Sequence, residues 1–534
     1  MKRDQIFNII LAVVLALLLL ICILTVLAVF RLGMIPAKFC YMLAGVFAFL
    51  VALTGLLMFL RLRKKAVSLL RRIIACVLAV LIAAGCVFIC SVTNKVYNTV
   101  QNITTPPSLE SVRTVYVLSD SSAQTLADLA DVTFGVMGGY EEASSQEAIG
   151  VIEEQLGKQI TVLWYDSVTD VVDNLYNGQI EAMILNSAYL GVLKDMDGYD
   201  DIYALTRPLY DAPVTLPSDP TDPSDPDDPT DSTDVSDPSE STEPSEGGWN
   251  PGLMDPSKPS EMKDITQRVF AIYVSGSDSK SEMLSSSTRS DVNIVVLVNP
   301  MTKQILLLNT PRDYYVANPN GYGAMDKLTH CGLFGVNCSV RTLELLYNVR
   351  IDYYVRINFA GFKSLIDAIG GINVYSSYEF TTVEGVSVVK GYNYFNGAEA
   401  LAFARERKQL PSGDHSRGRN QMRIIEAIIS KLSSGSVLLT NYSSILDSLN
   451  GMLTTNMSAD NINKLVKMQL NDMAQWTVLS YAVEGNDGYE PIYSWPGQTV
   501  YVIYPNKKHV EQATSLMRRM FNGEVLTKDD LKRW

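Results

Sequence analysis

The chain has 534 residues, of which 47% are hydrophobic and 9% aromatic, and its formal net charge is -13. A chain of this length and apolar content is expected to fold into about three domains, which excludes a protein with a single small core. These totals average over unequal parts, because much of the apolar content lies in three segments and much of the negative charge in one tract.

Three stretches without any charged residue predict membrane-spanning helices, namely residues 8–30, 41–60 and 73–92. Each has about 20 residues or more, enough to cross a hydrocarbon core about 30 Å thick. A cleaved secretory signal explains the first stretch poorly, because the apolar run is too long, no clear cleavage pattern follows it and two further spans come next. We therefore predict three transmembrane helices within residues 1–92.

The distribution of lysine and arginine between the spans predicts their orientation. Lys2 and Arg3 precede the first span and residues 61–72 hold six basic side chains, whereas the first loop has only Arg31 and Lys38. The positive-inside rule places the N-terminus in the cytoplasm and everything after about residue 93 outside the cell. The segments left inside are too short to fold, so we expect no nucleic-acid partner.

Residues 93–210 are predicted to form an extracellular α/β accessory domain. Short apolar strands at 114–119, 133–137, 159–165 and 181–186 alternate with helical patterns at 123–130, 145–156 and 168–177. Such alternation indicates an α/β layer. The stretch VVDNLYNGQIEAMILNSAYLGVL, residues 171–193, resembles a lobe of extracellular solute-binding proteins. No single residue stands out as a ligand contact.

Residues 211–265 are predicted to be an acidic, proline-rich linker. Residues 211–246 contain twelve acidic side chains, eight prolines and no basic residue. Like charges repel, proline removes backbone donors and little apolar surface is available, so this tract is expected to be extended. We expect such a linker to let the following domain work at a distance from its anchor. A calcium site is disfavoured, because no ligand loop with a turn glycine is present.

Residues 266–534 are predicted to form the third domain, an α/β fold with its core at 268–435. Strand patterns occur at 269–275, 292–298 and 303–309, and the last two are joined by NPMT as a hairpin. Helical spacing follows at 341–348, 362–370 and 417–434, with further strands at 353–358, 372–376, 476–485 and 498–505.

Charged residues in this domain gather at the strand ends. Asp278 follows the first strand, Arg289 and Asp291 precede the second, and Arg312 follows the third. The stretch AFARERKQLPSGDHSRGRNQ adds Arg405, Arg407, Asp414 and Arg417. Ends of neighbouring strands converge, and polar groups there face a crevice. Arginine matches phosphate oxygens and carboxylates bind hard cations, so the pattern fits a phosphate ester or diphosphate with Mg²⁺.

Two local features of this domain can be checked against a structure. Arg405 and Arg407 can grip one anion together only from an extended segment, since a helix would turn them about 200° apart. The helix that starts at NGAE, residues 396–399, should therefore end before Arg405. Cys331 and Cys338 lie outside the membrane and are candidates for a disulfide, with a metal site including His330 as the weaker alternative.

A set of linked motifs in the third domain resembles the LytR–CpsA–Psr family. The motifs are SGSDSK, RSDVNIVVLVNP, LLLNTPRDYYV, DKLTH, VRINFAGFKSLIDAIGGINV and AFARERKQLPSGDHSRGRNQ, in the family's order across residues 268–435. The resemblance implies a membrane-anchored, outward-facing enzyme of a Gram-positive envelope. It also implies an α/β/α sandwich with an apolar lipid cleft, and transfer of a glycopolymer, such as teichoic acid or capsule, from a polyprenyl pyrophosphate carrier to peptidoglycan.

The resemblance also implies roles for individual residues. It assigns Asp278 and Asp291 to Mg²⁺, with Mn²⁺ as a substitute. It assigns pyrophosphate binding to Arg289, Arg312, Arg405 and Arg407. It matches the family's last polar cluster with Asp414, Arg417 and Gln421. Lys280 replaces the arginine of many members, which keeps the charge but loses the planar fork. Phe359 and Phe362 are candidates for the lipid cleft, although ordinary core packing is the simpler explanation of each of them singly.

Two other functions fit the same residues. A pyrophosphate hydrolase would use the same metal and arginines with water as the attacking group. A non-enzymatic envelope sensor or transcriptional attenuator is the second alternative, suggested by the three spans and the region that resembles a solute-binding lobe. The general base is open between Asp414 and Asp278, and the residues do not decide which polymer is moved.

Overall fold

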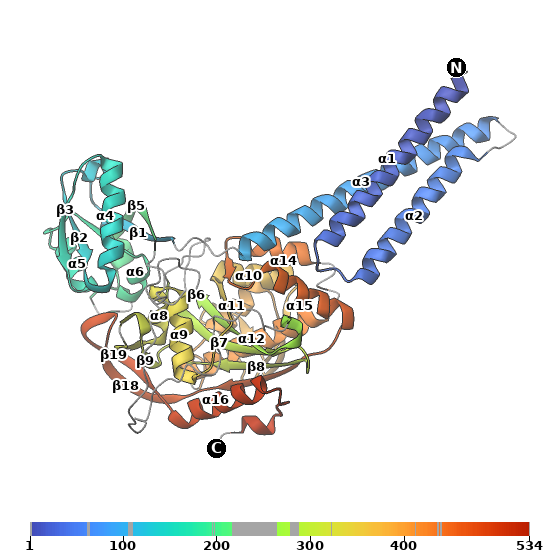
Figure 1. Ribbon diagram of the computed structural model, residues 1–534. Coiled ribbons are helices and arrows are strands. Elements are labelled where there is room, and N and C mark those ends of the chain that lie inside the picture. The colour runs from blue at the N-terminus through green and yellow to red at the C-terminus, as the bar shows by residue number, and fades with distance from the viewer. Residues whose placement is uncertain are drawn as a thin grey trace, which may run out of the picture.

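Three bodies lie in a row in the computed structural model, with the membrane helices at one end, the third domain in the middle and the accessory domain at the other end (Figure 1). The structure describes residues 3–60, 65–104, 110–194, 196, 198–215, 264–277, 288–321, 323–411, 413–434, 437 and 441–532. Asp278, Lys280 and most of the predicted linker lie outside these residues.

The three predicted spans are helices, α1 (Arg3–Arg31), α2 (Ala37–Phe59) and α3 (Lys65–Thr104). Their candidate membrane segments have mean hydropathies of 3.5, 2.4 and 3.1. Cys22 and Cys86 are buried where the helices pack, as expected for cysteines that fill apolar space. The third helix continues twelve residues past the predicted end of its span at residue 92, so residues 93–104 are a rigid extension of α3 rather than part of the accessory domain.

The accessory domain is a five-stranded sheet in the order β3-β2-β4-β1-β5 with helices packed on it. The strands are β1 (Glu110–Leu118), β2 (Thr133–Met137), β3 (Thr161–Tyr165), β4 (Ala182–Leu185) and β5 (Thr206–Thr215). The helices are α4 (Glu142–Leu156), α5 (Val168–Tyr176), α6 (Ala188–Leu193) and α7 (Ile202–Leu205). Strands β2, β3 and β4 are parallel and β1 is antiparallel to β4 and β5.

Two predicted boundaries of this domain differ from the structure. The helix predicted at 123–130 is only a short 3₁₀ turn, Leu126–Leu129, which Thr125 and Asp128 cap reciprocally. Strand β5 pairs with β1 as far as Thr215, so the first five residues of the predicted linker belong to the sheet. Proline and aspartate are depleted in strands, which is why composition alone misplaced this edge.

The third domain is built on a six-stranded sheet in the order β16-β11-β6-β7-β8-β17. Its strands are β6 (Phe270–Ser277), β7 (Ser290–Asn299), β8 (Gln304–Asn309), β11 (Tyr353–Ile357), β16 (Leu453–Thr455) and β17 (Thr477–Ala482). The predicted hairpin is confirmed, because β7 pairs antiparallel with β8 across the NPMT turn. Strand β11 is parallel to β6 and β17 is parallel to β8.

Alternating side chains of this sheet point into two cores, one on each face. Tyr273 and Leu297 face α9 (Val336–Tyr347) and α16 (Lys507–Phe521). Phe270 and Val296 face α12 (Gly413–Ser433) and α15 (Ala459–Asp472). Successive residues of a strand point to opposite faces, so apolar runs such as VNIVVLV can serve both layers. This arrangement confirms the predicted α/β/α sandwich.

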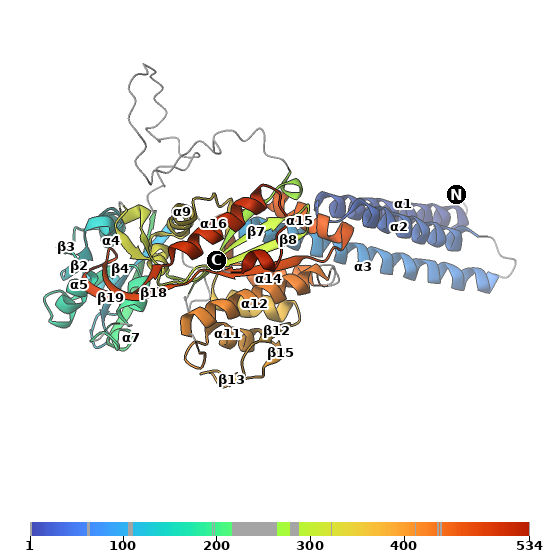
Figure 2. The same cartoon turned by 90° about the horizontal axis from the view of Figure 1, so that it is seen from below.

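A smaller apolar layer lies beside α12, away from the main sheet (Figure 2). It contains α10 (Phe359–Ala368), α11 (Gly397–Arg405), α14 (Tyr442–Leu449) and the hairpin of β12 (Ile372–Ser376) and β15 (Gly391–Phe395). The short pair β13 (Phe380–Thr381) and β14 (Ser387–Val388) closes its outer end. Phe362 packs against this layer, as a residue of its core or of a lipid cleft would.

The segments after the sheet strands connect the site to its neighbours. After β8 come β9 (Tyr315–Ala317), the 3₁₀ turn Pro319–Gly321, β10 (Met325–Lys327), α8 (Leu328–Cys331) and the 3₁₀ turn Gly332–Phe334. After β17 comes the hairpin of β18 (Gly485–Ile492) and β19 (Trp495–Pro505), which is followed by α16. Two further 3₁₀ turns, Ile265–Gln267 and Asp529–Leu531, lie at the two ends of the domain.

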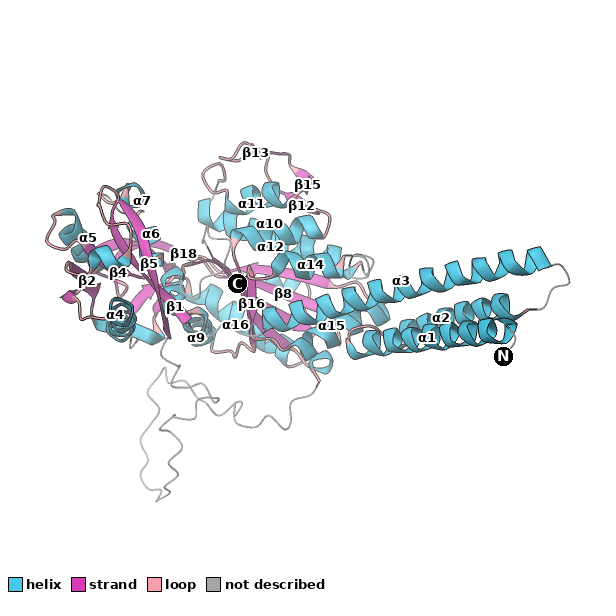
Figure 3. Cartoon of the chain, turned by 90° about the horizontal axis from the view of Figure 1, so that it is seen from above, coloured by secondary structure: helices cyan, strands magenta, loops and turns pink. Residues whose placement is uncertain are grey.

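The third domain is packed against both of its neighbours. Leu333, Ile492 and Trp495 share one buried apolar cluster with accessory-domain residues such as Leu190 and Leu193. On the opposite side α14 packs against α3, as Figure 3 shows from above. The expectation that a long linker lets this domain work at a distance from its anchor is therefore wrong. Composition describes the linker itself and carries no information about which surfaces the joined domains bury.

Candidate functional site

The predicted site residues of the sheet gather at one edge. Because β7 and β8 run antiparallel, the start of β7 lies beside the end of β8. Asp291 is near the start of β7, and Arg312 comes shortly after the end of β8. The guanidinium Nη1 of Arg312 donates to Oδ1 of Asp291 at 2.9 Å. Thr329 donates its hydroxyl to the same oxygen at 3.3 Å. Arg312, after β8, and Thr329, in α8, thus both fix the Asp291 carboxylate through its Oδ1.

Asp313 extends this pair into a cluster. Its Oδ2 lies 3.5 Å from Nε of Arg312, and its Oδ1 lies 3.2 Å from Nζ of Lys327. The side chains of Arg312 and Asp313 are 16% and 11% exposed, so these charges are largely removed from water. A buried charge is stable only when paired.

The first turns of α12 bring two more charges to the cluster. Asp414 and Arg417 form an ion pair one turn apart, and Asp414 lies where the helix dipole favours a negative charge. The helix approaches β8 closely at Gly418, where a Cβ would lie 2.3 Å from Nδ2 of Asn309. A glycine at this position is therefore what allows Arg417 to reach the sheet edge.

Electrostatics join these residues into one site. Burial alone would raise the pKa of Asp291, but the charges of Arg312, Arg289 and Arg417 outweigh it and hold the pKa well below its usual value. The Asp291 carboxylate in turn raises the pKa of Arg312. Asp291 is therefore ionised at neutral pH, and Arg312 and Arg417 are each paired with an acidic side chain.

Arg405 and Arg407 lie at the far end of α11. Asn396 and Glu399 form the capping box that starts this helix, as predicted. The expectation that the helix ends before Arg405 is wrong by one residue, because the amide of Glu406 still donates to Ala402 and Arg405 is the last helical residue. Glu406 is in extended backbone, and a turn follows at Arg407, whose carbonyl accepts from the amide of Leu410.

The two arginines have different surroundings. Nη1 of Arg405 lies 3.2 Å from Oε1 of Glu384, and its guanidinium lies 5.0 Å from the centre of the Phe359 ring. Arg407 is exposed and makes no ion pair within the described part of the chain. No contact among the described residues joins either of them to Asp291. Gln421 of α12 donates its Nε2 to the carbonyl of Ala404 at 3.4 Å, so α12 contacts the end of α11 beside Arg405.

Arg289 lies beside the accessory domain. A Cβ built on Gly191 of α6 would lie 3.4 Å from Nη2 of Arg289 and 3.7 Å from the hydroxyl of Tyr203. The accessory domain therefore forms part of the surroundings of a predicted pyrophosphate-binding arginine, which nothing in its sequence indicated.

Comparison with known proteins now bears on this site. The profile of the LytR_cpsA_psr family matches residues 240–519, just over half of the chain. The chain belongs to the LytR–CpsA–Psr family.

Two relatives of this chain have names that state a function. Two proteins named polyisoprenyl-teichoic acid–peptidoglycan teichoic acid transferase TagU are each 36% identical to this chain, from Enterococcus faecalis over 211 residues and from Bacillus anthracis over 198. These stretches cover 39% and 37% of this chain, and the chain spans 68% and 63% of those relatives. Both relatives come from Gram-positive bacteria.

Solved structures of the family were also found. TagT bound to LI-WTA is 27% identical with a TM-score of 0.40, and the match covers 50% of this chain and 95% of that one. TagV of Bacillus subtilis has the same identity and TM-score and is covered over its full length, again by 50% of this chain.

The predicted disulfide of this LytR–CpsA–Psr protein is not formed in the structure. Cys331 and Cys338 are buried free thiols. The sulfur of Cys331 donates to the carbonyl of Lys327, and that of Cys338 donates to Oδ1 of Asn318 at 3.2 Å. The hydrogen bond with Cys338, together with burial, raises the pKa of Cys331. The weaker alternative of a metal site with His330 also has no support, because His330 is hydrogen-bonded to Ser494 at 2.8 Å.

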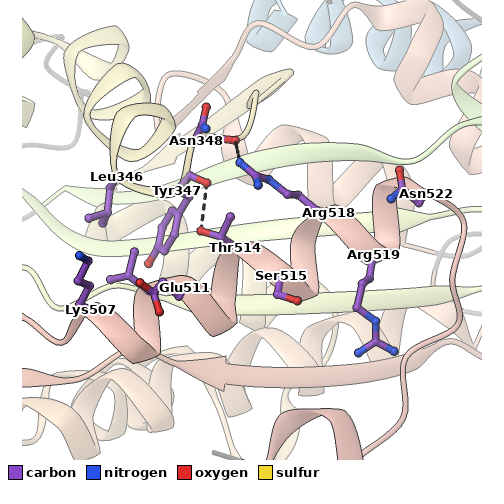
Figure 4. Close-up of a pocket in the computed structure, with 11 residues that line it drawn as sticks. Leu346, Tyr347, Asn348, Lys507, Glu511, Thr514, Ser515, Arg518, Arg519 and Asn522 are labelled. Atoms are coloured by element: carbon purple, nitrogen blue, oxygen red, sulfur yellow. Dashed lines mark hydrogen bonds between the residues drawn. The ribbon is translucent and has the colours of Figure 1, made fainter. Parts of the chain in front are cut away.

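A hollow with a volume of about 570 Å³ lies elsewhere, between α9 and α16 (Figure 4). Thr514 and Arg518 of α16 donate to the carbonyls of Tyr347 and Asn348 at its upper edge. None of its lining residues is a predicted site residue. It is an open surface groove, and we assign it no function.

Several site residues were missed in the sequence. Lys327 and Thr329 lie inside the motif DKLTH, which carried the family resemblance, but neither was proposed individually. Asp313 lies inside the motif LLLNTPRDYYV, directly after Arg312, and it was not assigned a role either. Arg356 is 1% exposed in the middle of β11 and donates to the carbonyl of Thr288 at 2.7 Å. The signal for Arg356 was an arginine inside an apolar strand, VRIN, where only a paired charge is tolerated.

Proposed function

We propose that this protein transfers a glycopolymer, of the teichoic acid kind, from a polyprenyl pyrophosphate carrier to peptidoglycan. The observation that carries the proposal is the cluster of Asp291, Arg289, Arg312 and Arg417 at one sheet edge, inside the segment that matches the family. The substrate class comes from the TagU relatives, which are named as teichoic acid transferases.

The proposed reaction is a displacement at phosphorus. A hydroxyl oxygen of peptidoglycan forms a bond to the phosphorus nearest the polymer, and the bond from that phosphorus to the bridging oxygen breaks. Polyprenyl phosphate leaves with the electron pair, and the hydroxyl proton passes to a carboxylate. Asp414 is the described candidate for this base. Arginines neutralise the non-bridging oxygens, since such transfers depend mainly on positioning and charge.

Mg²⁺ is part of the proposal, and the donor set has to be tested against it. Within the described residues no group of three or more His, Cys, Asp or Glu side chains could hold a metal. Asp291 nevertheless suits a hard cation, because it is ionised and both of its hydrogen bonds with described residues fall on Oδ1. Asp291, with Asp278 from outside the described residues, would hold the ion. When bound, it would neutralise charge on the diphosphate.

The metal has a direct test. We expect transfer to stop after complete removal of Mg²⁺ and Mn²⁺ with EDTA and to return when either ion is added. Calcium-free buffer containing Mg²⁺ serves as the control for chelation of other ions. Turnover that continues unchanged in EDTA would remove Asp278 and Asp291 from any metal role.

The arginines are tested by substitution. Arg405→Ala and Arg407→Ala should each reduce transfer about a hundredfold or more, because each removes a donor to the developing negative charge. Lys408→Ala, a neighbouring exposed cation outside the predicted site, is the matched control and should transfer normally. The assay follows polymer joined covalently to wall material, which separates a transferase from a hydrolase that releases free polymer. Normal transfer by either arginine variant would contradict its assigned role.

A further inference from the structure

Residues 93–104 of α3, past the predicted end of its span, carry an apolar face that is covered by the third domain. Val96, Val100 and Ile103 are spaced four and three residues apart, so they lie on one side of the helix, and their exposures are 5%, 3% and 6%. Leu446 of α14 is 5% exposed and belongs to the same cluster. We call this surface the dock; its buried members are Leu32, Met34, Val96, Val100, Ile103 and Leu446.

Polar contacts surround the dock and join three separate parts of the membrane anchor to the third domain. They are Lys95 Nζ to Asp447 Oδ2 at 2.6 Å, Asn463 Nδ2 to the Leu32 carbonyl at 3.1 Å, and Lys38 Nζ to the Asn471 carbonyl at 3.0 Å. Lys95 is 61% exposed and Asp447 32%, so this ion pair adds little by itself. The buried aliphatic side chains hold the dock together, and the polar contacts fix its orientation.

Helix α14 connects the dock to the proposed site. Its Leu446 faces the dock, whereas Ile445 and Leu449 pack into the apolar layer that contains α10 and α11. Helix α10 begins at Phe359, the residue whose ring lies against the Arg405 guanidinium. Helix α14 therefore packs both against a membrane-spanning helix and against the layer in which α10 begins beside Arg405, and Figure 1 shows α3, α14 and α10 side by side.

Given the proposed function, the packing of the third domain on the membrane anchor affects how the lipid-linked donor meets the site. A polyprenyl pyrophosphate is held by its chain in the same bilayer that α1, α2 and α3 are long and apolar enough to cross. A domain that could rotate freely on a linker would meet such a donor only in a fraction of its orientations. We propose that the dock is a positioning surface for the transfer reaction, which holds the third domain on the membrane anchor so that the Arg405 end of the site meets a membrane-held diphosphate.

The test uses the full-length protein in lipid vesicles and two donors of the same head group. One is a long-chain polyprenyl diphosphate disaccharide embedded in the same vesicles, and the other is a short-chain, water-soluble analogue. Leu446→Asp places a carboxylate in the dock. We expect kcat/KM for the embedded donor to fall about tenfold or more, because the effective concentration of donor at the site is lost. Turnover of the soluble donor should stay near the wild-type value, which also shows that the domain is folded.

Exchanging the charges of Lys95 and Asp447 tests whether use of the embedded donor can be restored. Lys95→Glu should lower use of the embedded donor, and adding Asp447→Lys should restore it. Lys158→Glu is the matched control, since Lys158 forms an exposed ion pair with Asp131 at 2.5 Å within the accessory domain. That variant should use both donors normally.

The possible results distinguish the positioning role of the dock from the proposed transferase function, on which that role depends. Equal use of the embedded donor by wild type and Leu446→Asp would overturn the proposal, and so would an equal loss with both donors, which would make Leu446 only structural. A wild-type protein inactive on both donors would overturn the proposed function and with it the positioning role. The contact itself is judged separately: a Val100→Cys, Leu446→Cys pair should cross-link on oxidation in membranes, and a Val100→Cys, Ser444→Cys pair should not, because Ser444 is exposed on the same helix.

Discussion

Replacing Asp291 by asparagine removes one charge and keeps the shape of the side chain. A hydrogen bond to a charged group contributes about 1.5–3 kcal/mol, and breaking a buried ion pair costs about 3–5 kcal/mol. Asp291 and Arg312 are 20% and 16% exposed and lie 2.9 Å apart. Because some solvent reaches both side chains, we expect a loss of local stability at the low end, about 2 kcal/mol.

Native-state hydrogen exchange of the β7 and β8 amides in the full-length protein measures this loss as a local opening free energy. Asp472→Asn is the matched control: it breaks the pair of Asp472 with Lys303, 2.6 Å apart and 40% exposed at the acid, beside the start of β8. The control should cost less than about 1 kcal/mol. If Asp291→Asn opens β7 no more easily than Asp472→Asn does, the cluster is not the buried charge network described above.

The direction in which the pKa of Asp291 is shifted also determines how the stability loss of Asp291→Asn depends on pH. The folded protein lowers the pKa of Asp291, chiefly through Arg312 against the opposing effect of burial. The stabilisation is therefore complete above the unfolded pKa of about 4 and declines as the pH falls below it. The difference in opening free energy between wild type and Asp291→Asn should stay at about 2 kcal/mol from pH 8 to pH 5. It should become smaller at lower pH.

Two further predictions concern the neighbours of the cluster. Gly191→Leu should displace Arg289 and lower kcat/KM about tenfold, whereas Gly191→Ala should be tolerated because its Cβ would lie at an ordinary contact distance of 3.4 Å; equal activity of the leucine variant would show that α6 does not constrain Arg289. Burial lowers the pKa of His330, so stability should be complete above about pH 6.5 and fall as the pH drops through 6 to 5, by at most about 1.4 kcal/mol per pH unit. His330→Asn should flatten that slope in a thermal melt, and an unchanged slope would assign it to other groups.

Much of the fold follows from local patterns in the sequence. Runs of uncharged apolar residues define α1, α2 and α3, and the turn NPMT between two apolar strands gives the β7–β8 hairpin. The capping residues Asn396 and Glu399 mark the start of α11. Each of these features depends on residues close together in the chain, so spacing alone is sufficient to predict it.

The part of the site that lies at the ends of the sheet strands was predictable from the sequence. Asp291 and Arg312 were predicted to converge because neighbouring strands end at a common edge, and they form an ion pair. The buried Arg356 was not predicted, because its stabilisation comes from Thr288 across the sheet rather than from its own strand. The end of α11 was misplaced by one residue, since one more backbone hydrogen bond decides where a helix stops and no side chain encodes it.

The arrangement of the three bodies is where sequence patterns failed, and the reason is physical. The composition of an acidic, proline-rich tract indicates that its own residues bury little apolar surface. We therefore predicted that this tract keeps the domains it joins apart. Loop closure becomes less favourable only slowly with length, so a long linker opposes docking weakly. Whether two domains dock depends instead on their complementary apolar surfaces, and here Trp495 and Leu333 cover the accessory domain while Leu446 covers α3. The apolar side chains at 96, 100 and 103 were visible as a helical stripe past the membrane span, and a stripe of this kind needs a partner.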